Sequence, residues 1–430
     1  MLHSCLFVKT KPKHQSPSLL MQEQTIQSRK NKNCFYICGL TGGPFFPIPA
    51  IIKQVQNYLP NANPVLIGVK NSYESKIASE LLYIIEYLPK AKLDILSFKN
   101  LNFLELIAGF FGSVVSILML VFSVAKCLFL LIKYRPILVY STGSFLAVPM
   151  LWATKLTNIL KLTNSKIVVH QQDATMGLAN RLTANLANIK SCVFPFTKST
   201  YVQFQNAQLI PNPIIVDKYS SDRIWQNTEL EAFVKNKTVD KPLLLIFGGG
   251  SGALAINQWV SANIDILIKS FKVVHLTGLL QNPTKTKGQK IVSNSLTELS
   301  EQQYTKSSTT FLSDSFNLGS EYYKQQSIFT DMPTLLSNAS LVVCRAGLGS
   351  ISELSLLNKP TFLVPLQNSH QEQNAYLIAK TNSNFKVLKQ ENQDNWLNII
   401  KDTKFEIVET NFDRQALDQY YNKLIKLINS

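Results

Sequence analysis

Residues 243–253 read LLLIFGGGSGA, an apolar run that passes directly into a glycine-rich turn, and a helical pattern begins near Ala253. Residues 34–43, CFYICGLTGG, have the same construction about 210 residues earlier, and an apolar helical pattern follows them through Val55. Glycines at such a turn allow the chain to bend sharply, and they let a phosphate approach the free N–H groups of the helix. Two strand–turn–helix openings at this separation predict two similar doubly wound domains.

The remaining apolar runs predict a parallel sheet in each half of the chain. They are continuous rather than alternating, and stretches with helical periodicity separate them. Strands of this kind are buried on both faces, as in α/β proteins. The fold class predicted from the sequence is therefore α/β. The runs lie at residues 65–68, 138–140 and 167–169 in the first half and at 273–276, 341–344 and 361–365 in the second.

The composition of the 430 residues indicates an anionic partner that is not a nucleic acid. The 43 Lys and Arg against 27 Asp and Glu give a net charge of +16, yet only 16% of the residues are charged. A basic protein attracts anionic membranes and phosphorylated ligands, whereas nucleic-acid binders usually carry a more highly charged surface. The Cys and His residues show no spacing typical of a zinc site, so neither a metal site nor a disulfide framework is expected.

Changes in composition divide the chain into a tail and two domains. Residues 1–33 are basic and polar and are predicted to form a disordered tail. Their apolar run is too short for a signal peptide, so the protein is expected to stay in the cytoplasm. The predicted N-terminal domain covers residues 34–216 and the C-terminal domain covers residues 239–410, with a polar connector between them. A Ser-, Thr-, Lys- and Gln-rich stretch at residues 283–309 is predicted to be a surface insertion.

One segment of the N-terminal domain is apolar enough to meet a membrane. Residues 106–125 carry no charge and are long enough to cross a bilayer, and Lys126, Lys133 and Arg135 follow them. A spanning helix, however, would place the next strand on the wrong side of the membrane from its own domain. The whole segment, residues 103–133, is therefore predicted to be a helix or helical hairpin that dips into one leaflet. The alternative is an unusually apolar core helix.

Neither glycine-rich turn matches a common cofactor motif closely. No Gly-Lys-Ser/Thr follows either turn, so neither is a P-loop. Gly248, Gly250 and Ala253 fit the relaxed dinucleotide fingerprint, but the next strand ends without the acidic residue that would hold an NAD ribose. Phosphate binding is the preferred interpretation of both turns, and a purely structural tight turn is the alternative.

The densest polar cluster follows two later strands. Residues 344–353, CRAGLGSISE, lead into a helix that Ser350 or Ser352 could cap, with Glu353 in its first turn. Residues 365–374, PLQNSHQEQN, place amides after the next strand. Open α/β sheets bind ligands at the carboxyl ends of their strands, so Glu353 is a candidate for holding a ribose diol. A capping role alone is the alternative.

The N-terminal domain carries polar groups at the corresponding edge of its sheet. Residues 170–173, HQQD, are expected to follow the strand that ends at Val169, and residues 177–181, GLANR, open a helix. His170 in this position is as consistent with a structural as with a catalytic role. Asn212 and Pro213 predict a turn.

Taken in order, these motifs resemble the MurG family of glycosyltransferases from residue 34 almost to the end of the chain. That family transfers N-acetylglucosamine from UDP-N-acetylglucosamine to undecaprenyl-pyrophosphoryl-N-acetylmuramyl-pentapeptide in peptidoglycan synthesis. The resemblance implies the glycosyltransferase B fold, in which two Rossmann-like domains face a cleft. It also implies an inverting reaction that needs neither a metal nor a cofactor. The motifs that carry it are residues 39–43, 170–173, 177–181, 212–213, 248–253, 257–258, 344–353 and 370–375.

The resemblance implies that the C-terminal domain binds the UDP-sugar. Glu353 would hold the uridine ribose, and Arg345 would help to shape the nucleotide pocket. Residues 249–252 would bind the diphosphate, while Gln371 and Asn374 would contact the sugar. The implied donor-binding residues are Gly249, Gly250, Ser251, Gly252, Arg345, Gly347, Glu353, Gln371 and Asn374.

The acceptor side follows from the same resemblance. Thr41, Gly42 and Gly43 would bind the polyprenyl-pyrophosphate acceptor. An apolar patch with basic neighbours holds the family, as a peripheral protein, on the anionic cytoplasmic face of the plasma membrane, and segment 103–133 fits that description. The last helix, within residues 411–430, would pack back on the N-terminal domain.

Several positions depart from the family pattern. Pro44 stands where the family usually has a histidine, Gln171 replaces a usual glutamate, and Ile215 replaces a common arginine. Asp173 replaces a common asparagine and could serve as the base, so Asp173 and His170 are the catalytic candidates. Two alternatives stay open. One is a related UDP-sugar transferase with another lipid acceptor, and the other is an inactive membrane-bound UDP-sugar binder.

Overall fold

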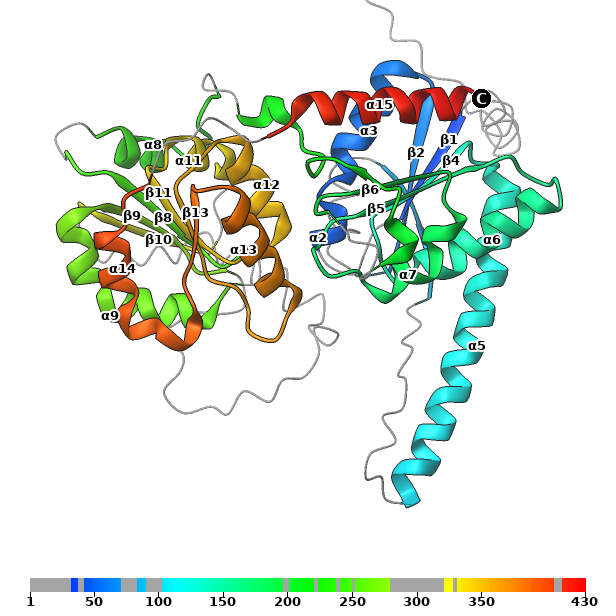
Figure 1. Ribbon diagram of the computed structural model, residues 1–430, viewed down its shortest axis with the longest axis horizontal. Helices are drawn as coiled ribbons and strands as arrows, with labels where there is room; N and C mark the ends of the chain where they lie inside the picture. Colours follow the sequence, from blue (N-terminus) through cyan, green and yellow to red (C-terminus); the bar gives the residue numbers. More distant parts are fainter. Residues whose placement is uncertain are drawn as a thin grey trace, which may run out of the picture.

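The computed structural model consists of two parallel α/β units (Figure 1). It describes residues 32–37, 42–70, 83–89, 103–195, 201–219, 223–236, 240–249, 252–278, 321–327, 331–405 and 412–430. Thr41, Gly250 and Ser251 lie outside these ranges, as do the predicted surface insertion and residues 1–31 of the predicted tail.

The N-terminal unit is built on a seven-stranded parallel sheet of order β3-β2-β1-β4-β5-β6-β7. The central strand β1 pairs with β2 on one side and with β4 on the other, so Phe35 lies beside both Val65 and Val139. Most residues of these central strands are apolar and buried. The strands are β1 (Lys32–Ile37), β2 (Ala62–Gly68), β3 (Ile84–Tyr87), β4 (Leu138–Ser141), β5 (Lys166–Gln171), β6 (Ile189–Cys192) and β7 (Gln208–Leu209).

Helices cover both faces of this sheet because alternate side chains of each strand point to opposite sides. Helices α3 (Ile48–Tyr58) and α15 (Arg414–Asn429) pack on the face that carries Cys34 and Tyr36. The opposite face is covered by α5 (Phe103–Tyr134), α6 (Ala147–Ile159) and the neighbouring α7 (Leu178–Thr183). A short helix α2 (Gly42–Phe45) precedes α3.

The C-terminal unit repeats this plan with a six-stranded parallel sheet of order β10-β9-β8-β11-β12-β13. One face packs against α8 (Thr228–Lys235), α11 (Met332–Asn338), α12 (Leu348–Leu356) and α13 (His370–Thr381), and the other against α9 (Leu254–Ser270) and α14 (Trp396–Asp402). The predicted α/β class with two Rossmann-like domains is confirmed. The strands are β8 (Leu243–Phe247), β9 (Lys272–Leu276), β10 (Tyr323–Gln326), β11 (Leu341–Cys344), β12 (Thr361–Leu363) and β13 (Phe385–Val387).

Two predicted boundaries in the N-terminal unit were wrong. The first strand begins at Lys32, inside the predicted tail, because its backbone pairs with the start of β2. Strand β5 runs through His170 and Gln171, which were predicted to follow it. Both polar side chains are buried there and hydrogen-bonded, which is what allows polar residues to end a buried strand.

The apolar segment forms one continuous helix, α5, and not a hairpin. Its C-terminal part belongs to the core through Cys127, Leu130 and Leu131, while Leu118 and Phe122 are about 60% exposed. The helix extends well beyond the body of the N-terminal unit (Figure 1). Within the described ranges, no helix combines the length and apolarity that crossing a bilayer requires.

Helix α15 closes the N-terminal unit although it follows the whole C-terminal unit in sequence (Figure 1). The Asp413 carboxylate caps it by accepting the Ala416 N–H at 2.8 Å. The Tyr420 hydroxyl donates to the Tyr140 hydroxyl of β4 at 3.0 Å, and Leu424 is buried in the same apolar cluster. The chain therefore crosses between the two units twice, which ties their positions together.

Replacing Leu424 tests how much this helix contributes to the N-terminal unit. Leu424→Ala is expected to lower the free energy of unfolding by about 2–4 kcal/mol, because it opens a cavity between α15 and the sheet. Urea unfolding followed by tryptophan fluorescence measures the change. The exposed neighbour Lys423 supplies the control, since Lys423→Ala should change stability by less than about 0.5 kcal/mol. Equal effects of the two variants would contradict the packing of α15.

Candidate active site

The strand orders place a ligand-binding edge in each unit. Each sheet changes direction between its first strand and its fourth, at β1–β4 in the N-terminal unit and β8–β11 in the C-terminal unit. Ligands of doubly wound folds bind at the carboxyl ends of the strands beside such a switch point. The glycine-rich turns follow β1 and β8, so both lie at these points.

The turn after β8 is shaped by two glycines with left-handed backbone. Gly249 has φ +88° and Gly252 has φ +82°. A Cβ added at Gly252 would lie 2.2 Å from the Thr277 carbonyl oxygen, so the turn lies directly against the end of β9. No side chain caps the first N–H groups of the following helix α9. An anion could therefore reach these groups, which carry the positive end of the helix dipole.

A buried histidine fixes the base of this turn. The Asn257 amide donates to the Thr277 carbonyl at 2.9 Å, and the Asn257 Oδ1 lies 3.1 Å from His275 Nε2. His275 Nδ1 lies 3.1 Å from the Tyr323 hydroxyl. Burial lowers the pKa of His275 to about 4, so this histidine is neutral at physiological pH and serves as a fixed hydrogen-bonding link.

The predicted turn after β1 is described only from Gly42 onward. Gly42 opens helix α2, and Gly43 is exposed with open space around its Cα. The Thr142 hydroxyl, after β4, donates to the Pro44 carbonyl at 2.6 Å. This bond connects the loops after β1 and β4, the two strands at the switch point of the N-terminal unit.

The loop after β11 carries two of the predicted donor residues, Arg345 and Gly347. The Arg345 guanidinium donates to the carbonyls of Val364 and Pro365, each at 3.1 Å, and to Gln390 Oε1 at 3.0 Å. Arg345 therefore holds the loop after β12 in place. Gly347 is the N-cap of α12, and open space surrounds it.

The predicted capping at α12 was wrong. The N-cap is Gly347 and makes no side-chain cap, while the Ser352 hydroxyl donates back to the Leu348 carbonyl at 2.6 Å. Glu353 lies beyond the first turn of the helix, so it does not serve the helix dipole. The capping alternative for this cluster is thereby removed.

Glu353 instead meets a residue that the sequence did not single out. The Tyr219 hydroxyl, at the end of the short helix η3 (Val216–Tyr219), donates to Glu353 Oε1 at 2.5 Å. Burial raises the pKa of Glu353 to about 7, although the hydrogen bond from Tyr219 and the charge of Lys218 act in the opposite direction. Burial thus favours the protonated carboxyl, while Tyr219 and Lys218 favour the ionised one.

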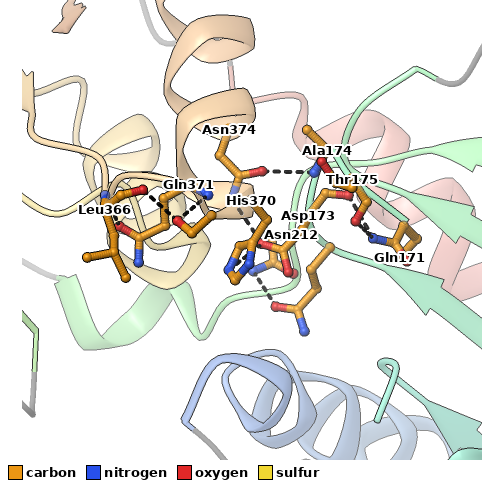
Figure 2. A network of polar contacts seen from close by, with 11 residues as sticks. Gln171, Asp173, Ala174, Thr175, Asn212, Leu366, His370, Gln371 and Asn374 are labelled. Atoms are coloured by element: carbon orange, nitrogen blue, oxygen red, sulfur yellow. Dashed lines mark hydrogen bonds and ion pairs between the residues drawn. The ribbon is translucent and has the colours of Figure 1, made fainter. Parts of the chain in front are cut away.

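The two units meet through a polar network around Asn374 (Figure 2). The Asn374 Oδ1 accepts the Ala174 N–H at 2.8 Å, and its Nδ2 donates to Asp173 Oδ1 at 2.9 Å. His370 Nε2 lies 3.8 Å from the same Asp173 oxygen. Asn374 is fully buried, whereas Asp173 and His370 are partly open to solvent. A predicted catalytic residue thus contacts a predicted sugar-binding residue across the domain boundary.

Helix α13 presents its N-terminus to this network. Ser369 caps the helix by accepting the Gln371 N–H at 3.2 Å. The Gln371 Oε1 accepts the Leu366 N–H at 3.1 Å, which ties the start of α13 to the loop after β12 (Figure 2). Gln371 and Asn374 thus lie on the first two turns of one helix, and Asn374 contacts Asp173.

The environment of His170 favours the structural alternative over a catalytic role. His170 is fully buried, and its ring nitrogens lie 3.0 Å from the Ser191 hydroxyl and 3.1 Å from Asn212 Oδ1. Burial lowers its pKa to about 4, so the ring carries no charge near neutral pH. Asn212, predicted only as a turn residue, is the partner that anchors the end of the N-terminal unit to β5.

The loop that bears Asp173 is organised by Gln171. Its Nε2 donates to the Asp173 carbonyl at 2.7 Å and to the Thr175 carbonyl at 3.2 Å. Its Oε1 accepts the Asn180 amide at 2.6 Å. The Asp173 and Thr175 carbonyls accept hydrogen bonds from the Gln171 amide nitrogen. An ionised glutamate at this position has no hydrogen to donate and could not make these bonds.

No metal is needed to explain these contacts. Among the residues that the structure describes, no group of three or more His, Cys, Asp or Glu could hold a metal ion. Metal independence stays a prediction.

Comparison with known proteins identifies the family. The model of the glycosyltransferase family 28 N-terminal domain matches residues 35–189, and that of the family 28 C-terminal domain matches residues 243–406. The chain belongs to glycosyltransferase family 28. The first matched region covers β1 to β5 of the N-terminal sheet and the second covers the whole C-terminal sheet, and together they include Asp173, Glu353 and Asn374.

Relatives within family 28 confirm the resemblance to MurG. A protein of Caldicellulosiruptor saccharolyticus is 28% identical over 358 residues, which is 82% of this chain and 84% of the relative. A protein of Treponema denticola is 29% identical over 386 residues, which is 86% of this chain and 87% of the relative. Both are named UDP-N-acetylglucosamine–N-acetylmuramyl-(pentapeptide) pyrophosphoryl-undecaprenol N-acetylglucosamine transferase.

A solved structure agrees with the fold. The crystal structure of Acinetobacter baumannii MurG has a TM-score of 0.56 at 17% identity, and the match covers 92% of this chain and 95% of that one. At that identity the likeness supports the two-domain fold alone.

Gly252 offers a test of the turn after β8. Gly252→Ala is expected to destabilise the protein by about 2 kcal/mol or more, because its φ is left-handed and the new Cβ would strike the Thr277 carbonyl. Thermal unfolding by calorimetry measures the loss. Gly347→Ala is the control, since a Cβ there meets open space. A Gly252→Ala protein as stable as the control would show that this turn is not held against β9.

Proposed function

We propose that this protein transfers N-acetylglucosamine from UDP-N-acetylglucosamine to undecaprenyl-pyrophosphoryl-N-acetylmuramyl-pentapeptide, with inversion at the anomeric carbon. The observation that carries the proposal is the contact of Asp173 with Asn374, which brings the loop after β5 to the N-terminus of α13. A group transfer between two ligands needs such a junction, because donor and acceptor bind to different domains. The names of the relatives supply the two substrates.

The donor would lie along the carboxyl edge of the C-terminal sheet. Its diphosphate would bind the turn that contains Gly249 and Gly252, where the first N–H groups of α9 are uncapped. Its ribose would bind Glu353, and Gly347 leaves room for the nucleotide. The sugar would then reach Gln371 and Asn374, so the anomeric carbon would lie near Asp173.

The acceptor would approach from the N-terminal unit, with its pyrophosphate near Gly42 and Gly43. Asp173 would take the proton of the attacking sugar hydroxyl while the new glycosidic bond forms and the bond to UDP breaks. The departing UDP would keep the bonding electrons, and the N–H groups at the start of α9 would stabilise its charge. Pro44 has no side-chain proton acceptor, whereas the Asp173 carboxylate contacts Asn374 directly.

A related UDP-sugar transferase with another lipid acceptor is the second candidate. The observation that favours it is the replacement of the histidine usual in the family by Pro44 on the acceptor side. Pro44 can hydrogen-bond only through its backbone carbonyl. Both candidates use the same donor site and the same base.

The membrane surface would be formed by α5 and α6, which pack against each other. No acidic residue occurs between Glu105 and Asp173, whereas Lys126, Lys133 and Lys155 lie on these two helices. A face that combines apolar and basic side chains suits the anionic cytoplasmic leaflet of the plasma membrane. The apolar side chains at least half exposed on and beside these helices are Leu118, Val121, Phe122, Phe129, Trp152, Ile159 and Leu160.

Turnover by the purified full-length protein tests the proposed reaction. Mass spectrometry should detect the disaccharide lipid and UDP when both proposed substrates are supplied. Asp173→Asn is expected to lower kcat by about 10²–10⁴-fold because the amide cannot accept the proton, while UDP affinity changes by less than about twofold. The exposed Asp402, mutated to Asn, is the control. An unchanged rate in Asp173→Asn would exclude it as the base, and activity with another lipid only would favour the second candidate.

The membrane surface predicts vesicle binding. Leu118→Glu combined with Phe122→Glu should lower binding to phosphatidylglycerol-containing vesicles by about tenfold or more, because two exposed apolar contacts are replaced by negative charge. Co-sedimentation measures the bound fraction. Ile224→Glu combined with Ile266→Glu, exposed apolar positions outside α5 and α6, is the matched control. Equal binding by both double variants would contradict this assignment.

A further inference from the structure

Tyr219 is hydrogen-bonded to the carboxyl group that would bind the ribose of the proposed donor. Its hydroxyl donates to Glu353 Oε1 at 2.5 Å, although 134 residues separate the two in sequence. Tyr219 lies at the end of η3, which follows Asn212 and Pro213 at the end of the N-terminal unit. Glu353 lies on α12 of the C-terminal unit. The contact therefore joins the segment that leaves one domain to the predicted nucleotide site of the other.

The position of Tyr219 is determined by the junction between the domains. Its ring packs against the apolar clusters of both the N-terminal and the C-terminal unit. An ion pair between Asp217 and Lys53 of α3 holds η3 on the N-terminal side. The Arg223 guanidinium donates to the Lys218 carbonyl of η3 at 3.1 Å, which adds a second polar contact to this segment. The phenol thus reaches Glu353 from a segment that is anchored independently of α12.

A phenol hydroxyl and a ribose hydroxyl bind a carboxylate through the same kind of hydrogen bond. Each donates one hydrogen bond, and a buried carboxyl has few directions from which a donor can approach. We propose that Tyr219 is a positioning residue that takes the place of the nucleotide ribose on Glu353 while the donor site is empty, and that it yields this place when a nucleoside diphosphate binds. The inference rests on the proposed role of Glu353 in nucleotide binding.

The charges around Glu353 make the exchange sensitive to its ionisation. Lys218 acts on the carboxyl from η3, Arg223 acts on Tyr219, and the Cys344 thiol lies near the carboxyl from β11. Burial and the neighbouring Glu353 raise the pKa of Tyr219, and burial raises that of Cys344, so both stay neutral up to about pH 9. Only Glu353 changes charge near neutrality, and its hydrogen bond from Tyr219 favours the ionised form.

Calorimetric titration of the full-length protein with UDP tests the exchange. At about pH 9, where the Glu353 carboxyl is ionised with or without Tyr219, Tyr219→Phe is expected to bind UDP about fivefold to tenfold more tightly, because no phenol hydroxyl competes with the ribose. The gain should vanish for 2′,3′-dideoxy-UDP, which lacks the two hydroxyls. Below neutrality the advantage should shrink, because loss of the phenol raises the pKa of Glu353 and moves the onset of UDP binding to higher pH.

The controls separate this inference from the proposed function. Tyr134 donates to the Glu86 carboxylate at 2.6 Å at the edge of the N-terminal sheet, so Tyr134→Phe removes the same kind of bond away from the donor site and should leave UDP affinity within twofold. If Glu353→Ala leaves UDP affinity unchanged, the ribose role of Glu353 fails, and with it this inference. If Glu353→Ala weakens binding but Tyr219→Phe neither tightens it nor moves its pH dependence, only the exchange is overturned.

Discussion

The amide of Asn374 is the interaction on which the arrangement of the site depends. It accepts the Ala174 N–H and donates to the Asp173 carboxylate, so it uses both halves of one side chain at a fully buried position. Only an amide meets both demands, because a carboxylate at position 374 would place two negative charges within about 3 Å of each other. The pair therefore fixes how closely the acceptor-side loop can approach α13, and with it the distance over which a sugar would be transferred.

Neutral polar side chains of the N-terminal unit hold the loop that Asn374 contacts. Gln171 binds the carbonyls on both sides of Ala174, and Asn180 completes the hydrogen bonding of Gln171. His170 links β5 to β6 and to Asn212 without carrying charge. Buried polar groups need hydrogen-bond partners, and these side chains supply them to one another, with Asn180 Oδ1 as the exception. Asp173 thereby projects from a rigid support while its own carboxylate stays partly exposed.

The sequence was sufficient to predict the fold and the ligand-binding edges of the two sheets. Continuous apolar strands next to glycine turns determine a doubly wound topology, and that topology alone brings the loops after β8, β11 and β12 together. It was not sufficient for contacts between the domains. Asp173 and Asn374 are 201 residues apart, and Tyr219 and Glu353 are 134 apart, so no local periodicity reports either pair. The polar end of β5 was missed for a related reason, since His170 and Gln171 resemble loop residues until their distant partners are known.

The order of elements around β4 connects the proposed membrane surface to the proposed acceptor site. Helix α5 ends just before β4, and α6 begins a few residues after it. Between β4 and α6 lies Thr142, whose hydroxyl binds the Pro44 carbonyl next to Gly42 and Gly43. The two helices that would rest on the lipid are thus the two that flank this loop. On the proposed function, the head group of a polyprenyl-pyrophosphate held at these helices would approach Gly43 past this loop, which a hydrogen bond joins to α2. On the proposed function, the exposed apolar area of α5 and α6 would serve the lipid acceptor, which gives a reason for leaving these side chains uncovered.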